Sequence, residues 1–236
     1  AISDNVDPAN DVYFSQGPMD VLDHACSKFA FGGKMCLDAT TKEQGATVKS
    51  QAAGEIQAAE LQNQFLEIRE ANTTLLKMGI SVLFISVQKN RKNHIKELNE
   101  KLYASFQFSN ISVPKFVIYV EHTVDVMDIK DTMWRFANNF DPKRDSFPAS
   151  GGIGMDGTRK TKKLDDFHRP WPNIICADEV TIKNVDEKWS RMFGNFENEN
   201  PKAPFRAGGD AVLPFIPSPS LKYRKQLYKG GAVAEE

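Results

Sequence analysis

The chain has 236 residues, enough for one large domain or two small ones with a buried core. Its 30 Lys and Arg nearly balance its 31 Asp and Glu, so no global positive field exists to attract nucleic acid. The longest apolar run, residues 80–87, is too short to cross a bilayer. The three cysteines lack metal or redox spacing, so we expect a reducing compartment and a cytoplasmic protein.

Residues 1–42 predict an incomplete α/β unit. Ala1-Ile2 resembles the end of a strand, which suggests that the chain starts within a longer protein. Residues 18–25 predict a short helix, and residues 34–37 predict the strand that follows it.

Residues 43–79 predict one long linking helix. Leu61, Phe65, Ile68 and Leu75 lie on one stripe of this helix, among Gln, Glu and Asn residues. A surface helix docked on the sheet is one interpretation, and a helix that reaches a neighbouring subunit is the other.

Residues 80–197 predict a complete unit with an appended loop. Buried strands are expected at residues 80–87 and 115–121, and a third after the glycine turn at residues 151–156. A helix over residues 91–107 and a second one capped by Asp128 lie between them. This order predicts an α/β fold, with a mostly parallel sheet flanked by helices in three layers.

Residues 198–236 predict a proline-rich arm and a terminal helix over residues 218–229. Arms of this kind often embrace a partner subunit, so we expect a homo-oligomer, a dimer or larger.

The chain also repeats itself. Val6-Asp7 matches Val124-Asp125, and residues 37–42 match residues 155–160 at the same separation along the chain. Each copy of the second match has the form Asp-x-Thr-x-Lys, in which the carboxylate can accept local N–H groups and pair with the lysine. The candidate polar residues are Asp38, Thr40, Lys42, Asp125, Asp156, Thr158 and Lys160.

Other chemistry has weaker support in the sequence. Residues 151–154, with Arg159 and Lys160 nearby, are a candidate phosphate site, although the P-loop spacing is missing. His122 and Asp125 follow a strand end, where a turn histidine is the simpler interpretation than a catalytic one. His168 lies in an aromatic loop, residues 167–172, which is either a binding loop or a packed corner. No metal site is expected.

Several stretches together carry a family resemblance: residues 18–25, 33–42, 115–125 and 140–145, and the Trp171-Pro172 pair. They resemble the C-terminal domain of UbiD-like decarboxylases, the 3-polyprenyl-4-hydroxybenzoate carboxy-lyases and their relatives. The family pattern normally occurs once, whereas here it is split over two copies, and Gly157 stands where alanine is usual. The resemblance therefore indicates an elongated variant with a duplicated C-terminal unit.

The resemblance implies a reaction for the parent protein. That reaction is the (de)carboxylation of an aromatic or α,β-unsaturated acid, such as a polyprenyl-hydroxybenzoate in quinone biosynthesis. It implies a prenylated FMN cofactor together with a divalent metal and potassium. The prenylated FMN supplies the difficult chemistry. It also implies a glutamate–arginine–glutamate set in a catalytic barrel domain upstream of every matched residue. For this chain alone it implies no cofactor, no catalytic residue and a role in subunit contacts.

Two functions of other classes stay open at this point. The chain is alternatively a non-enzymatic α/β interaction module, or a small phosphate- or nucleotide-binding domain that uses the turn at residues 151–160.

Overall fold

The computed structural model describes residues 1–42, 55–108 and 111–172, together with short stretches between residues 180 and 213. The chain divides into two units, Ala1–Pro172 and Asn173–Glu236. In the second unit, positions between 180 and 188 are helical, and β8 (Phe205–Arg206) pairs antiparallel with β9 (Val212–Leu213). The remainder of the predicted arm and the terminal helix over residues 218–229 lie outside the described residues.

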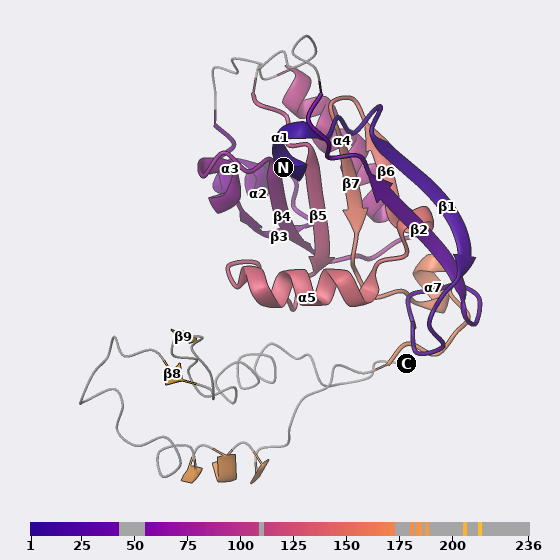
Figure 1. Ribbon diagram of the computed structural model, residues 1–236. Coiled ribbons are helices and arrows are strands. Elements are labelled where there is room, and N and C mark those ends of the chain that lie inside the picture. The colour runs from indigo at the N-terminus through magenta and orange to yellow at the C-terminus, as the bar shows by residue number, and fades with distance from the viewer. Residues whose placement is uncertain are drawn as a thin grey trace. The chain divides into compact units, whose positions relative to one another are not determined.

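The first unit contains all the other elements (Figure 1). Its helices are α1 (Ile2–Asn5), α2 (Ala58–Gln64), α3 (Thr74–Lys77), α4 (His94–Phe108), α5 (Ile129–Asn139), α6 (Pro142–Asp145) and α7 (Lys162–Asp165). Its strands are β1 (Val12–Pro18), β2 (Phe31–Leu37), β3 (Ile68–Asn72), β4 (Val82–Val87), β5 (Phe116–Glu121), β6 (Ser146–Ala149) and β7 (Gly152–Asp156).

A mixed five-stranded sheet forms the centre of the first unit. Its strand order is β3-β4-β5-β7-β6, in which β4, β5 and β7 run parallel and the two outer strands run antiparallel. The parallel strands and the helices α4 and α5 between them are those predicted from residues 80–156. The α/β class is confirmed, and the antiparallel outer strands make the sheet mixed.

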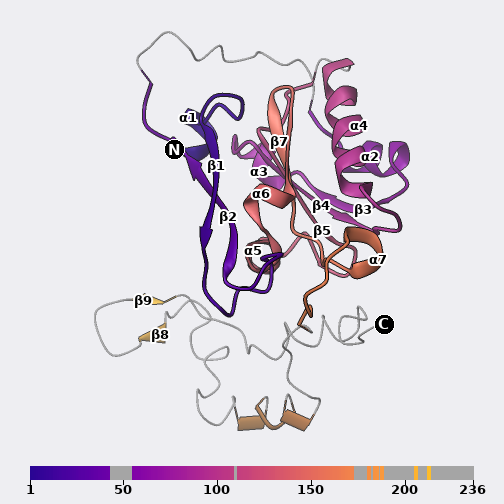
Figure 2. The same cartoon turned by 90° about the vertical axis from the view of Figure 1, so that its right-hand side faces the viewer.

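Each face of the sheet carries its own apolar core, because successive side chains of a strand point to opposite faces. Leu83, Ile85 and Val117 pack with α4 and α2 in one cluster. Phe84, Phe116 and Ile118 pack with α5 and with the β1–β2 hairpin in the other. Figure 2 shows α4 and α2 on one side of the sheet and the hairpin on the other.

The long helix predicted over residues 43–79 is wrong for its described part. Residues 55–79 form α2, then β3, then α3, while residues 43–54 lie outside the described residues. Ile68 is in a strand and not in the predicted helix. β3 pairs antiparallel with β4 and thereby satisfies the backbone groups along the edge of β4. Asn72 then donates to the Val126 carbonyl at 2.7 Å, which ties this edge to the loop before α5. Tertiary pairing overrides local helix propensity here.

Two expectations for residues 1–42 are also wrong. Ile2 begins α1 rather than ending a strand, and residues 18–25 contain no helix. The side chains of Asp20 and Asp23 accept the N–H groups of Leu22 and Ala25, both at 2.8 Å, and so fold this segment into turns. The predicted strand at residues 34–37 is the end of β2, which forms an antiparallel hairpin with β1.

The hairpin is attached to the sheet through a close approach of two backbones. The N–H of Gly33 donates to both carboxylate oxygens of Asp141, each at 3.2 Å, just before α6. A Cβ atom on Gly33 would overlap Asp141 Oδ1 and lie 2.5 Å from the backbone nitrogen of Lys143. The position therefore requires glycine for space.

We predict that Gly33→Ala lowers the free energy of unfolding by about 1–3 kcal/mol, because the added methyl group overpacks this contact. Gly17→Ala is the matched control in the same hairpin, since its Cβ would meet Lys34 at an ordinary 3.4 Å. Urea unfolding of both variants makes the comparison. Equal midpoints for the two variants would contradict the docking role of Gly33.

Candidate functional site: a buried lysine between carboxylates

The second Asp-x-Thr-x-Lys segment closes on itself at the carboxyl end of β7. Asp156 accepts the N–H of Thr158 at 2.8 Å and its hydroxyl at 2.5 Å. The ammonium of Lys160 donates to the carbonyls of Asp156 and Thr158 at 2.9 and 2.8 Å and lies 3.2 Å from Asp156 Oδ1. The lysine side chain is only 2% exposed, so this is a buried ion pair.

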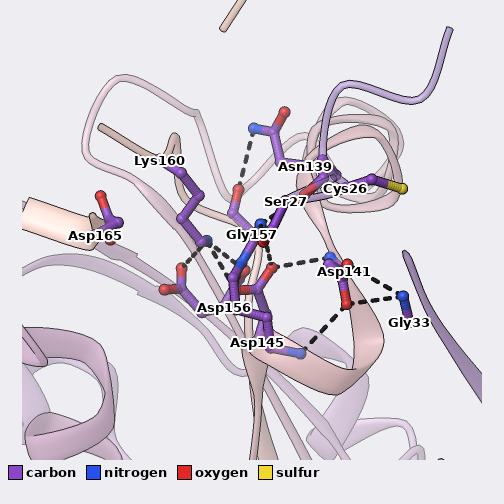
Figure 3. A network of polar contacts seen from close by, with 12 residues as sticks. Cys26, Ser27, Gly33, Asn139, Asp141, Asp145, Asp156, Gly157, Lys160 and Asp165 are labelled. Carbon is purple, nitrogen blue, oxygen red and sulfur yellow. Dashed lines mark hydrogen bonds and ion pairs between the residues drawn. The ribbon is translucent and has the colours of Figure 1, made fainter. Parts of the chain in front are cut away.

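Asp145, at the end of α6, approaches the same ammonium from the other side (Figure 3). Its Oδ1 lies 3.5 Å from Lys160 Nζ, and Arg144 pairs with both of its oxygens at 2.7 and 2.6 Å. The N–H of Asp141 donates to Asp145 Oδ2 at 2.9 Å. The lysine therefore joins the end of β7 to the turn that precedes β6.

Lys89 extends this network to the end of β4. Its ammonium donates to Thr158 Oγ1 at 3.1 Å and to the Arg159 carbonyl at 2.8 Å, and it pairs with Asp165 at 2.6 Å. The carboxyl edge of the parallel sheet is thus held together by two lysines and three aspartates.

Burial and the two lysines act on the carboxylates in opposite directions. Burial raises the pKa of Asp145, and Lys160 and Arg144 offset only part of that rise. Burial also disfavours the charge of Asp156, but Lys160, Lys89 and the hydrogen bonds from Thr158 outweigh it and lower the pKa of that carboxyl group. On acidification, Asp145 is therefore the first of the two to take a proton.

The first Asp-x-Thr-x-Lys segment repeats this local geometry at the surface. Asp38 accepts the N–H of Thr40 at 3.0 Å and its hydroxyl at 2.6 Å, and pairs with Lys42 at 2.7 Å. Lys42 also lies 3.2 Å from Asp11 Oδ1, and its side chain is 32% exposed. The hydrogen bonds from Lys42 and Thr40 hold the pKa of Asp38 below its usual range.

The sequence matched Val6-Asp7 with Val124-Asp125, but the turn at Asp7 resembles the turn at Asp141 in the structure. Asp7 and Asp11 form an Asp-Pro-x-x-Asp turn, in which the N–H of Asp7 donates to the Asp11 side chain at 2.8 Å. Asp141 and Asp145 form the same turn with the same bond at 2.9 Å. The counterpart of Asp7 is therefore Asp141, and the predicted match of Val6-Asp7 with Val124-Asp125 is wrong.

Asp125 lies apart from the network. Its side chain accepts the N–H of Met127 at 3.0 Å, and its carbonyl accepts the hydroxyl of Thr132 at 3.3 Å. The neighbouring His122 is in an exposed turn. These contacts give Asp125 a structural role at the start of α5, as the turn interpretation expects.

The candidate phosphate site at residues 151–154 is wrong. Gly152 and Gly154 lie within buried β7. A Cβ atom on Gly152 would overlap Tyr103, and one on Gly154 would overlap Asn99, both on α4. The glycines therefore allow α4 to pack closely on the strand, and Lys160 is occupied by its own partners.

The described residues do not fit a flavin by themselves. A pocket of about 220 Å³ lies beside the network, below the roughly 300–1,000 Å³ of typical ligand sites. It is lined by residues that include Lys89, Lys92, His94, Arg144, Lys160 and Asp165. Within the described ranges, no group of three or more His, Cys, Asp or Glu side chains could hold a metal ion.

The aromatic loop at residues 167–172 is a packed corner. Arg169 donates to the carbonyls of Asp23 and Cys26 at 3.0 and 2.7 Å, which fastens the loop to the turns after β1. Trp171 stacks edge-on against His24, with ring centroids 4.8 Å apart. Burial raises the pKa of the Cys26 thiol to about 11, so that thiol is not a reactive nucleophile at neutral pH.

Sequence reasoning missed five members of the network: Lys89, Asp141, Arg144, Asp145 and Asp165. The Asp-Pro-x-x-Asp pattern occurs at residues 7–11 and 141–145 and was the signal that could have found Asp141 and Asp145. No helix among the described residues is long and apolar enough to cross a membrane.

The fold and the site define an α/β domain whose polar strand ends are closed by internal ion pairs. The family model described as the 3-octaprenyl-4-hydroxybenzoate carboxy-lyase C-terminal domain matches residues 1–39 and 50–162. The chain belongs to this family.

Relatives of the chain are longer than the chain itself. An uncharacterised protein of Helicobacter pylori is 32% identical over 194 residues, which are 80% of this chain and 29% of that protein. One of Aquifex aeolicus is 57% identical over 125 residues, which are 46% of this chain and 25% of that protein. The matched part of the chain thus spans 29% of the first of these proteins and 25% of the second.

Two solved structures share low similarity with the chain. The vanillic acid decarboxylase of Sedimentibacter hydroxybenzoicus in closed form is 16% identical, with a TM-score of 0.44 over 58% of this chain and 31% of that one. An evolved dimeric form of the UbiD-class enzyme HmfF from Pelotomaculum thermopropionicum, in complex with prFMN, is 19% identical, with a TM-score of 0.40 over 54% and 27%.

We predict that Lys160→Met destabilises the chain far more than Lys42→Met. Removing Lys160 takes the buried ammonium away from Asp156 and Asp145, whose side chains are 7% and 2% exposed, and breaking a buried pair in this way costs about 3–5 kcal/mol. Removing Lys42 takes away an ammonium that is 32% exposed and whose nearer partner, Asp38, is 38% exposed, so the loss is smaller. Chemical unfolding of the two variants provides the measurement, and similar losses for both would refute the distinction.

The two carboxylates predict opposite effects of pH on stability. Because the pKa of Asp156 is lowered, its contribution is present above the ordinary value of about 3.9 and is lost as the pH falls through the folded-state pKa. Because the pKa of Asp145 is raised, its contribution is present below the ordinary value and is lost as the pH rises through the folded-state pKa.

Asp156→Asn is therefore expected to weaken the pH dependence of the free energy of unfolding below the ordinary aspartate pKa. Asp145→Asn is expected to weaken the pH dependence just above that pKa. Each change amounts to at most about 1.4 kcal/mol per pH unit for one proton. Urea unfolding between pH 2.5 and 6 measures both profiles. Variants that keep the wild-type shape would show that these carboxylates do not titrate as described.

Proposed function

We propose that this chain is the C-terminal part of a UbiD-like (de)carboxylase that acts on an aromatic or α,β-unsaturated carboxylic acid with prenylated FMN. The observation that carries the proposal is the family match over residues 1–39 and 50–162. The greater length of the relatives supports it, because they have room for a catalytic domain outside the matched region.

In this proposal the chain supports assembly and does not perform the chemistry. Lys89, Lys160 and Asp156 at the ends of β4 and β7 are engaged with partners within the chain, so in this proposal they do not bind a substrate carboxylate. Surface apolar side chains such as Leu22 and Phe29 remain exposed on the turns after β1, where a neighbouring domain or subunit can cover them. A polyprenyl-hydroxybenzoate of quinone biosynthesis is the substrate class that we propose, and a homo-oligomer is the proposed assembly.

We also propose that the two Asp-x-Thr-x-Lys segments belong to two copies of one duplicated unit. The matching turns at Asp7 and Asp141 and the matching bonds of Thr40 and Thr158 support this interpretation. The two copies have different roles in this proposal. The segment at residues 156–160 closes the carboxyl edge of the sheet, and the segment at residues 38–42 lies at the surface.

Intact mass and activity test the proposal together. The protein that carries this sequence in its source cell should be about three times heavier than the 26.5 kDa of this chain, since the chain matches 29% of the Helicobacter pylori relative. That longer protein, loaded with prenylated FMN, should release carbon dioxide from a 4-hydroxybenzoate-type acid, whereas this chain alone should not.

The assembly role has its own test. Deleting residues 1–172 from the longer protein should reduce its oligomeric mass in light scattering. An unchanged oligomer would contradict the assembly role, and carbon dioxide release by this chain alone would contradict the division of labour.

A further inference from the structure

The outer edge of β2 distinguishes the first hairpin from its counterpart. β7 pairs with β6 on one side and with β5 on the other. β2 pairs with β1, and no second strand pairs with it in the part of the chain that the structure describes. An unpaired strand edge presents N–H and C=O groups that pair readily with another strand.

The shared register of the two hairpins identifies the exposed groups. Val12 lies opposite Leu37 in the first hairpin, as Ser146 lies opposite Met155 in the second. In the second hairpin, the N–H groups of Ile153 and Gly157 donate to the carbonyls of Lys115 and Tyr119 at 2.9 and 2.8 Å, which joins β7 to β5. The equivalent positions along the first hairpin are Met35 and Ala39.

The short helix α1 has an equivalent as well. Asn5, two residues before Asp7, donates through Nδ2 to the Ala39 carbonyl at 3.0 Å. Asn139, two residues before Asp141, donates in the same way to the Gly157 carbonyl at 3.1 Å. Asn139 ends α5, which has 11 residues, whereas Asn5 ends α1, which has 4. α1 therefore corresponds to the last turn of α5.

We propose that the β2 edge at residues 35–39 is a docking surface for a strand–helix unit built like residues 116–139. The strand pairs in parallel with residues 35–38, as β5 pairs with β7, and its helix leads into the turn of α1. The longer protein described under the proposed function supplies this unit. The inference rests on the proposed function only for this source of the unit.

The side chains along β2 suit such a strand. Met35 and Leu37 are half-buried and pack against the core cluster on the α5 side of the sheet, whereas Lys34 and Cys36 face solvent. A third strand with apolar residues on its inner face would extend that core. Asp141 occupies only the Gly33 end of the edge, which leaves the Met35 end for the docked strand.

The experiment adds a strand–helix unit of this kind to the chain itself. Residues 111–134 are joined in front of Ala1, because Ala1 corresponds to Arg135 when Asn5 is aligned with Asn139. Hydrogen exchange of the Met35 and Ala39 amides is measured by NMR in the original and the extended chain. The docking predicts that both amides exchange at least about tenfold more slowly in the extended chain.

The control is the same extension with Val117→Pro in the added strand, because the odd-numbered positions of β5 face β7 and the proline removes an N–H that would face β2. It should leave both exchange rates as they are in the original chain. Unchanged rates in the unmodified extension, with the added helix visible by circular dichroism, would overturn the proposal. Amides that are already protected in the original chain and lose protection on dilution would overturn it too, since a second copy would then cover the edge. Neither readout depends on decarboxylase activity, so the proposed function is tested separately.

Discussion

The buried ammonium of Lys160 is the interaction on which the first unit depends. It lies between Asp145, at the end of α6, and Asp156, at the end of β7. A charge in this position needs partners on every side, because an unpaired buried ion costs several kcal/mol. The sequence supplies those partners from the Asp-x-Thr-x-Lys segment itself and from the Asp-Pro-x-x-Asp turn. The ion network thereby fixes how the β6–β7 hairpin meets the rest of the sheet.

The same motif in two environments separates local from tertiary effects. Local hydrogen bonds from threonine to aspartate are nearly identical in the two copies, as expected for a structure that neighbouring residues dictate. What differs is the cover. Lys89, which follows β4, closes the second copy, whereas the first copy is contacted by Asn5 of α1. An exposed pair such as Lys42–Asp38 contributes little to stability. Because the fold does not depend on this pair, the first copy is suited to contacts outside the chain.

The sequence predicted the parts of the fold that depend on local patterns. The β-branched run before Lys89 and the cap at Asp128 indicated β4 and the start of α5 correctly, since periodicity and capping are local properties. β3 was missed, because Ile68 and Ala71 become a strand only by pairing with β4. The internal pairing of the Asp-x-Thr-x-Lys lysines was anticipated, but Asp145 was not, since 11 residues separate it from Asp156 and only the hairpin brings them together. The family was evident from motifs taken as a set.

Nitrogen-15 NMR of the lysine side chains tests the central claim most directly. If Lys160 is an ammonium held by fixed hydrogen bonds in a site closed to water, its Nζ protons exchange slowly at neutral pH and give a resolved signal. That signal disappears in Lys160→Met and persists in Lys42→Met. Rapid exchange of every lysine ammonium in the folded chain would show that the network is open to solvent, and Lys160 would then not be the buried link between the end of β7 and α6.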